Sequence, residues 1–409
     1  MKMNARTPRP RGSGPARLGV GDAVSHVLHK HHLAPGSQGT NVRRVARDLV
    51  GLHATDPLSP YLSVLARMPD FESRMLDREL YEKRALARIP AMRNTLFIVP
   101  KALVGTLFAA TRRISLQSSW RYFASRLSHK EFEEAVPRVV QALAGRELAA
   151  SELRDATGLD CDVPAVIKLL CDEGVLVRAH PVRGWRDAHH TYALMTEWLP
   201  GVDITARGEA DSVRDLVRNY LATYGPVSEA DVVWWTGLAK ASVRAALSDL
   251  SNELAEIELA DVEGPFLMLR SDLEQVEHVR GPKESGMTLL PMLDPYLQGY
   301  RDRRRVLDPQ HTRFVIDPKG NATSTILLGE RVVGVWDVME KPKQAVRLHL
   351  FVSISEDHRA ELHDRAKHVG QFVVGSDVDI QEFRTMIPLS ERRGWVRSPL
   401  EGASDPSAL

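Results

Sequence analysis

The chain has 409 residues, more than one ordinary hydrophobic core can organise, so several domains are expected. Its composition, 43% hydrophobic and 26% charged, is typical of a folded globular protein, and no run approaches the 18 apolar residues of a membrane span. A formal net charge of +1 excludes nucleic-acid binding through a strong overall charge and leaves only a local basic surface for that purpose.

The cysteine content and the first residues indicate where the protein works. Only Cys161 and Cys171 are present, which argues against a disulfide scaffold and for a reducing compartment. We therefore expect a cytoplasmic location, associated with the nucleoid if the partner is DNA. Residues 1–17 are rich in arginine, proline and glycine and lack the apolar segment of a signal peptide, which indicates a disordered basic tail.

Residues 18–125 indicate a first helical unit. Apolar residues recur at helical spacing after Asn41, which is a suitable N-cap, and a polar stretch then leads into two short apolar strands. Helices followed by a hairpin are typical of a winged helix-turn-helix unit. The expected elements are helices at 42–50, 61–68 and 71–82 and a hairpin within 86–100.

Residues 126–205 repeat this order as a second unit. Gly158 and Gly174 are placed to end two of its helices, and a glycine- and arginine-rich turn separates its two strands. Three helices and a two-stranded wing again predict a winged helix. The expected elements are a helix at 131–143, a helix that begins at Ser151, a helix at 161–171, and strands at 175–178 and 191–194.

Residues 206–280 indicate a third unit of the same architecture. Ser228 caps its second helix and the pair Gly237-Leu238 forms the following turn. The three units share an order of elements but no sequence repeat. The expected elements are a helical stripe from Val213 to Leu221, helices at 229–236 and 241–250, and strands at 254–259 and 266–269.

The texture changes in residues 281–385, where short apolar strands alternate with turns and one helix closes the segment. This pattern predicts a small antiparallel β-barrel, and residues 386–409 indicate an unordered tail. The fold class is therefore α+β, with tandem winged helix-turn-helix units followed by the barrel. The expected elements are strands at 314–316, 323–328, 331–336 and 346–351 and a helix at 356–368.

One short motif, Gly51-Leu52-His53-Ala54-Thr55-Asp56-Pro57, follows the first predicted helix directly. Pro57 disfavours a helical Asp56, so the segment is expected to be extended. Side chains alternate along an extended chain, which would place His53 and Thr55 on the same side. By itself, such a motif is also consistent with a turn whose polar residues only satisfy backbone groups.

Several common chemistries have no motif in this chain. There is no glycine-rich phosphate loop, no GxSxG and no HExxH. His180, His189 and His190 do not have the spacing of metal ligands, and no CxxC is present. We therefore expect neither a metal nor a cofactor.

Tandem winged helices favour DNA as the partner, because such a unit places a helix in a groove and its wing on the backbone. Protein–protein contact is the alternative use of the same fold, and fold alone does not decide between them. The polar and basic residues of the predicted turns are the DNA-binding candidates, although an arginine-rich strand edge is also consistent with simple solvation. They are Arg93, Asn94, Arg183, Arg186, Arg301, Arg303, Arg304 and Arg305.

Between residues 20 and 380 the sequence resembles the AlkZ/YcaQ-type bacterial DNA glycosylases. That resemblance implies tandem winged helices and a β-barrel around a concave DNA-binding surface, and excision of alkylated purines, including bulky adducts and, in some members, interstrand crosslinks. The family's catalytic motif is usually Gln-apolar-Gln or Gln-apolar-Asp, whereas His53 and Thr55 occupy those positions here. The resemblance to this family lies in residues 51–57, Tyr61-Leu62-Ser63, Arg93-Asn94-Thr95-Leu96, Leu289-Leu290-Pro291, Asp294-Pro295-Tyr296, Gly299-Tyr300-Arg301-Asp302-Arg303 and Val333-Gly334-Val335-Trp336.

The resemblance implies that His53 and Thr55 are the catalytic residues, with Asp56 and Asp294 as supporting ones. Cleavage of an N-glycosidic bond develops oxocarbenium character on the sugar and needs a water at C1′. A neutral His53 would orient that water and accept its proton, and Thr55 would hold the water or the imidazole. Asp56 is more consistent with a structural cap.

The expected protein is a monomer that acts on duplex DNA carrying alkylated purines. Because the motif contains no lysine for a Schiff base, we expect a monofunctional enzyme without lyase activity. The competing hypothesis is a non-catalytic winged-helix DNA-binding regulator or damage sensor whose catalytic positions have diverged.

Overall fold

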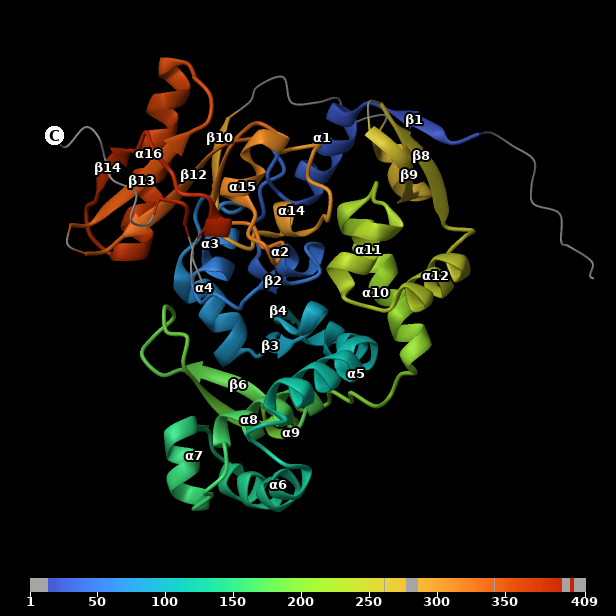
Figure 1. The fold of residues 1–409 in the computed structure, drawn as a ribbon, viewed down its shortest axis with the longest axis vertical. Helices are drawn as coiled ribbons and strands as arrows, with labels where there is room; N and C mark the ends of the chain where they lie inside the picture. The colour runs from blue at the N-terminus through green and yellow to red at the C-terminus, as the bar shows by residue number, and fades with distance from the viewer. Residues whose placement is uncertain (1–13, 261, 277–285, 342, 392–397, 401–409) are drawn as a thin grey trace, which may run out of the picture.

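The computed structural model describes residues 14–260, 262–276, 286–341, 343–391 and 398–400 (Figure 1). Most of the predicted N-terminal tail lies outside the described residues, but its last two residues belong to β1 (Ala16–Leu18), which pairs in parallel with a strand of the third unit. The predicted C-terminal tail is also partly outside them. Within it, Leu389 and Leu400 are buried, so this segment packs against the core.

The first unit contains a three-stranded sheet flanked by helices. Asn41 caps α2 as expected, its side chain accepting the N–H groups of Arg43 and Arg44. At Gly51 a Cβ would lie 2.8 Å from Val99, so only glycine allows the chain to approach the sheet here. The strand order is β2-β4-β3. The elements are α1 (Val20–Lys30), α2 (Val42–Asp48), β2 (Leu52–His53), α3 (Ser59–Leu65), α4 (Ser73–Asp77), the π-helical turn η1 (Arg78–Glu82), β3 (Leu86–Pro90), the turn η2 (Met92–Asn94), β4 (Leu96–Pro100), η3 (Lys101–Leu103) and α5 (Val104–Phe123).

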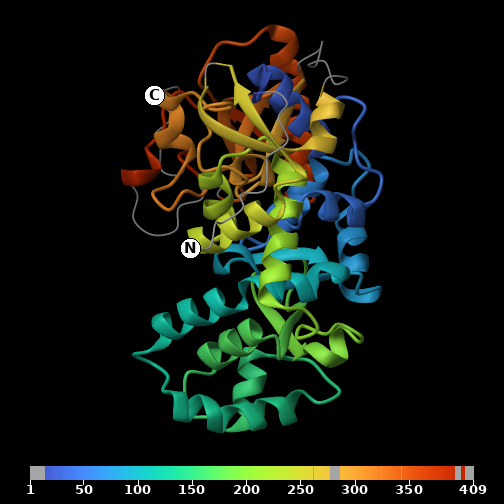
Figure 2. The same cartoon turned by 90° about the vertical axis from the view of Figure 1, so that its right-hand side faces the viewer.

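The second unit follows the predicted order of helices and strands. Ser128 and Glu131 form a capping box at its first helix, and Gly158 and Gly174 end the next two in left-handed conformation. Figure 2 shows this unit as the lower lobe of the molecule, with α5 at its junction with the rest. The elements are α6 (His129–Leu143), β5 (Leu148–Ala149), α7 (Ala150–Thr157), α8 (Val163–Glu173), β6 (Leu176–Pro181), β7 (His190–Leu194) and α9 (Met195–Trp198).

The third unit also has the predicted order. Ser228 and Asp231 form a capping box, and Gly237 ends the second helix in left-handed conformation. A hairpin follows the helices and carries β1 on its edge, in the order β1-β8-β9. The elements are α10 (Glu209–Tyr224), α11 (Glu229–Thr236), α12 (Lys240–Asp249), β8 (Leu254–Leu259), β9 (Val262–Leu269) and α13 (Arg270–Val276).

The C-terminal segment differs from the predicted barrel in two respects. Its five strands form an open sheet within the described residues, and the last strand runs parallel to its neighbour rather than antiparallel. The strand predicted at 314–316 is largely a helical turn, because Asp308 and Pro309 start a helical path there. The elements are β10 (Met287–Leu290), α14 (Pro295–Gln298), η4 (Pro309–His311), α15 (Thr312–Val315), β11 (Thr325–Leu328), β12 (Arg331–Met339), β13 (Ala345–Leu350), α16 (Glu356–Val374), β14 (Asp379–Glu382) and η5 (Leu389–Glu391).

The units share their hydrophobic cores instead of forming independent bodies. One core joins residues of all three units with the C-terminal segment, and a second joins the first unit to the C-terminal sheet and α16. The hairpin of the second unit is also docked: the ring of Trp185 lies 4.7 Å from that of Tyr61 and 5.3 Å from that of Phe372. The candidate motif in β2 is therefore fixed by several segments that are distant in sequence.

Candidate active site and DNA-binding surface

His53 lies at the end of β2 and is almost completely buried, with 6% of its surface exposed. β2 is an edge strand, and its pairing places His53 opposite Phe97, whose ring centroid is 4.9 Å away. The backbone N–H of Thr55 points to Nδ1 of His53 from 3.5 Å. This arrangement favours an unprotonated Nδ1 and a proton on Nε2.

The environment of His53 keeps its ring neutral. Burial, with the positive charge of Arg93 as a further cause, lowers the pKa of the imidazole to about 3. The ring is therefore uncharged at physiological pH. It can donate one hydrogen bond and accept another, as the amide of a glutamine can.

Thr55 does not share the environment of His53. It is exposed, and its hydroxyl oxygen accepts the backbone N–H of Leu96 at 3.3 Å. Residue 54 remains paired with β4, since its N–H donates to Leu96 O, but the chain then bends. The extended path expected for residues 52–56 is therefore seen for residues 52–54, and the chain bends from Thr55 onward.

Asp56 and Asp294 are both buried and both cap helices. Oδ2 of Asp56 accepts the N–H groups of Leu58 and Ser59 at the start of α3, which agrees with the structural cap inferred from the sequence. Asp294 forms a bidentate ion pair with the fully buried Arg67, with both distances 2.8 Å. This ion pair, together with the hydrogen bond that Ser63 donates to Asp294, holds α3 and the residues after it to the C-terminal segment.

Arg93 belongs to a layer of two arginines and one tryptophan that the structure assembles from three segments. Its guanidinium lies 4.3 Å from the ring centroid of Trp234 on α11, and that of Arg303 lies 4.8 Å from the same ring. Arg93 donates to Lys319 O at 3.1 Å and Arg303 donates to Gly320 O at 2.8 Å. Burial lowers the pKa of Arg93 and lowers that of Arg303 to about 10.

The remaining arginines of the 301–305 segment fall into two groups. Arg301 and Arg304 are exposed, and Arg304 is paired with Asp302 at 2.6 Å. They line a depression of about 470 Å³ together with Arg303 and residues of α11 and α15. Arg305 is buried, donates to Pro226 O at 2.8 Å and packs on Tyr300, so it serves the fold.

The other predicted DNA-binding residues make internal contacts. Arg183 pairs with Asp187 within its own hairpin at 3.0 Å. Arg186 donates to Val373 O at 2.5 Å and contacts Glu340 at 3.3 Å. Asn94 is bound to the side chains of Ser119 and Lys168. Arg183, Arg186 and Asn94 do not line the depression formed with Arg301 and Arg304.

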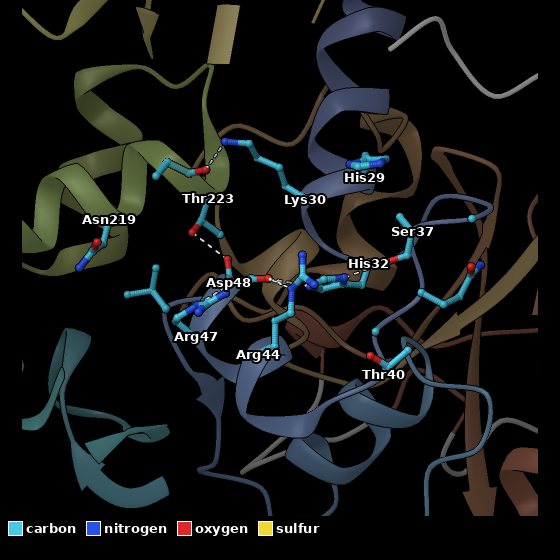
Figure 3. Close-up of a pocket in the computed structure, with 15 residues that line it drawn as sticks. His29, Lys30, His32, Ser37, Thr40, Arg44, Arg47, Asp48, Asn219 and Thr223 are labelled. Atoms are coloured by element: carbon cyan, nitrogen blue, oxygen red, sulfur yellow. Dashed lines mark hydrogen bonds and ion pairs between the residues drawn. The ribbon is translucent and has the colours of Figure 1, made fainter. Parts of the chain in front are cut away.

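A cavity of about 590 Å³ lies elsewhere, between α1, α2 and α10 (Figure 3). It is polar, and its basic side chains Arg44, Arg47 and His32 surround Asp48. His53 does not line this cavity. Among the described residues no group of histidine, cysteine, aspartate or glutamate side chains could hold a metal ion, and no helix is long and apolar enough to cross a membrane.

Two contributors to the site were not identified from the sequence. Trp234 looked like one of a pair of apolar residues in a helix, and Lys168 like a single lysine in an apolar stretch. The isolated charge within the apolar run 163–171 is the signal that points to Lys168. No local signal distinguishes Trp234 from Trp235, of which only the latter is buried in the core.

The fold and the site together define a mixed α+β protein with a buried, neutral histidine and a layer of two arginines and one tryptophan. The chain belongs to the AlkZ-like DNA glycosylase family, whose model matches residues 46–372. Its fold is similar to that of the Streptomyces sahachiroi DNA glycosylase AlkZ, with a TM-score of 0.71 and 20% sequence identity over 90% of this chain and 100% of that one. Comparison with curated proteins gives no match.

Proposed function

We propose that the protein is a monofunctional DNA glycosylase that hydrolyses the N-glycosidic bond of cationic alkylated purines in duplex DNA. The substrates would be N7 and N3 adducts, with bulky adducts and interstrand crosslinks as larger members of the same class. The observation that carries this proposal is the buried, neutral imidazole of His53, which stands where the family's motif usually begins with a glutamine.

Neutrality of His53 suits this substrate class. An N7- or N3-alkylated purine already carries a positive charge and leaves with little acid assistance. A protonated imidazole would repel such a base, whereas a neutral one acts as a hydrogen-bond partner for water or sugar. The role we assign to His53 is to orient the water at C1′ as a neutral hydrogen-bond partner, a role that does not require it to take up a proton.

Thr55 supplies the second polar group of the motif from the surface side. Its hydroxyl accepts the N–H of Leu96 and keeps its own proton available for donation to a water or a phosphate. We propose that Arg301 and Arg304 contact DNA phosphates, because they are exposed and lie in the same segment as Arg303, which stacks on Trp234. The absence of lysine from residues 51–57 supports hydrolysis without a Schiff base.

We further propose that the three helical units are winged helices and that the protein acts as a cytoplasmic, nucleoid-associated monomer. The order of helices and hairpins supports the first part. A chain with cores shared among its own units needs no second subunit to complete the fold, which supports the second.

A non-catalytic damage sensor is the second candidate. It is favoured by the same low pKa, because an imidazole that resists protonation is a weak general base. This candidate predicts salt-dependent DNA binding without base release.

Release of free base distinguishes the two candidates. Duplex oligonucleotides with one N7-methylguanine, one bulky N7 adduct or one N7 crosslink are incubated with the protein, and free base and alkali-labile sites are measured. Release from at least one substrate, slowed on the order of 100-fold in His53→Ala with unchanged DNA affinity, is the expected result. Binding without release from any of the three would favour the sensor.

A further inference from the structure

The turn between β3 and β4 has an unusual backbone conformation. Arg93 and Asn94 adopt positive φ angles of 56° and 55°. Residues other than glycine rarely adopt this left-handed region, although asparagine does so more often than most. Gly237 contacts this turn closely, since a Cβ there would lie 3.1 Å from the Cα of Arg93. The conformation therefore needs contacts from outside the turn to hold it.

Asn94 supplies those contacts through its side chain. Its Oδ1 accepts a hydrogen bond from Nζ of Lys168 at 2.9 Å, and its Nδ2 donates to Oγ of Ser119 at 3.3 Å. Ser119 in turn donates to Asp172 at 2.6 Å. Lys168 and Asp172 belong to α8 of the second unit and Ser119 to α5, so the turn of the first unit is held from two other helices.

The ion pair between Lys168 and Asp172 is otherwise difficult to explain. Nζ of Lys168 lies 2.5 Å from Oδ2 of Asp172, whose side chain is fully buried, while the rest of α8 is almost entirely apolar. A buried ion pair contributes little net stability compared with apolar residues, because both charges lose their hydration. The ion pair holds Nζ of Lys168 where it donates a hydrogen bond to Oδ1 of Asn94 in the turn.

We propose that Asn94 and Lys168 are positioning residues whose hydrogen bond fixes the turn that carries Arg93 and leads into β4 opposite His53. This inference rests on the proposed glycosylase function only for its kinetic consequence. With the turn fixed, the Arg93 guanidinium stays stacked on Trp234 and bound to Lys319 O. Leu96, which follows the turn, stays hydrogen-bonded to Ala54 and Thr55 on either side of the backbone next to His53. The second unit thus acts on the reaction through the first unit, without touching the substrate.

Three variants separate the side-chain contact from the backbone preference and from simple destabilisation. Asn94→Gly removes the contact while leaving a residue that adopts positive φ freely. Lys168→Met combined with Asp172→Asn removes the ion pair without leaving an unpaired buried charge. The third variant combines all three substitutions. Lys130→Met, at an exposed position of α6, is the matched control for loss of a lysine.

The primary readout is the single-turnover rate of base release. We expect Asn94→Gly and the double variant each to slow it on the order of 10- to 100-fold, as small misplacements of catalytic groups do. The triple variant should be no slower than Asn94→Gly, because that substitution alone already removes the contact with Lys168. Affinity for undamaged duplex and the rate of Lys130→Met should match those of the wild-type protein. An unchanged rate in Asn94→Gly, or effects that multiply in the triple variant, would overturn the proposal.

A second readout does not depend on catalysis. The ring signals of His53, assigned by their loss in His53→Gln, are recorded by nuclear magnetic resonance in each variant. They should move in Asn94→Gly, while those of His26 on α1 stay in place. If the wild-type protein releases no base, the glycosylase function fails and this measurement alone decides the positioning role. Unmoved His53 signals would then refute it.

Discussion

Replacement of His53 by glutamine tests the buried neutral imidazole directly. The His53 ring has a pKa of about 3 in the folded chain and about 6.5 when exposed to water. Above pH 6.5 the ring is neutral in both states and contributes no pH dependence. Below pH 6.5 the unfolded chain binds a proton that the folded chain does not, so the free energy of unfolding falls as the pH falls.

The size of this effect follows from the separation of the two pKa values. Between these two pKa values the free energy of unfolding falls by about 1.4 kcal/mol for each pH unit. A change from pH 7.5 to pH 5 therefore lowers it by about 2 kcal/mol through this residue. Glutamine does not titrate, and His53→Gln should therefore lose about 2 kcal/mol less than the wild-type protein over that interval. Urea denaturation followed by circular dichroism at pH 7.5, 6.5, 5.5 and 5.0 measures the difference.

His368→Gln is the matched control, because this histidine is exposed on α16 and meets water in both states. Its free energy of unfolding at pH 7.5 should equal that of the wild-type protein, as expected for an exposed position. The same His53→Gln variant should retain base release on the substrates accepted by the wild-type protein, since glutamine offers the same neutral donor and acceptor. A pH dependence of unfolding that is identical in His53→Gln and wild type would refute the neutral buried state.

Three further predictions concern the surroundings of the site. Asp294→Ala should lower the free energy of unfolding by about 3–5 kcal/mol, because it leaves the Arg67 charge buried without a partner; a loss below 1 kcal/mol in urea denaturation would contradict this. Trp185→Ala should lower the free energy of unfolding by about 2 kcal/mol and make the hairpin of the second unit more sensitive to limited proteolysis. Unchanged cleavage would show that the contact of Trp185 with Tyr61 is not needed to dock the hairpin. Arg301→Ala should lower the salt dependence of DNA affinity by about one phosphate contact and leave stability unchanged. Arg305→Ala should lower the free energy of unfolding and leave the salt dependence of DNA affinity unchanged. Equal effects of the two substitutions on DNA affinity would argue against this division of the segment.

The sequence predicts the helices of this protein well because their ends are determined locally. Asn41 and Ser228, both expected as caps, accept backbone N–H groups of the helix that follows, and Ser128 does the same at α6. Gly158 and Gly174 adopt the left-handed conformation that a helix end requires. These interactions span only a few residues, so they can be recognised without the tertiary structure.

The sheet of the C-terminal segment was harder to predict because strand pairing depends on residues far apart in the chain. The run at 314–316 has the apolar residues of a strand, but it continues a helical path that begins at Pro309. The last strand reaches its parallel position only after the long helix α16 has crossed the sheet. Neither the open edge nor the parallel pair has a local signature.

The path of residues 51–57, the predicted site, follows from local signals, since a capped helix, a glycine required for close approach and a proline determine it. The burial and the charge of His53 could not be predicted in this way. Phe97, Arg93 and the turn held by Lys168 surround His53 from positions 40 to 115 residues further along the chain. Burial and charge are properties of that assembly, and a pKa depends on both. The sequence by itself determined which imidazole stands in the motif, and only the tertiary structure decided that it is neutral.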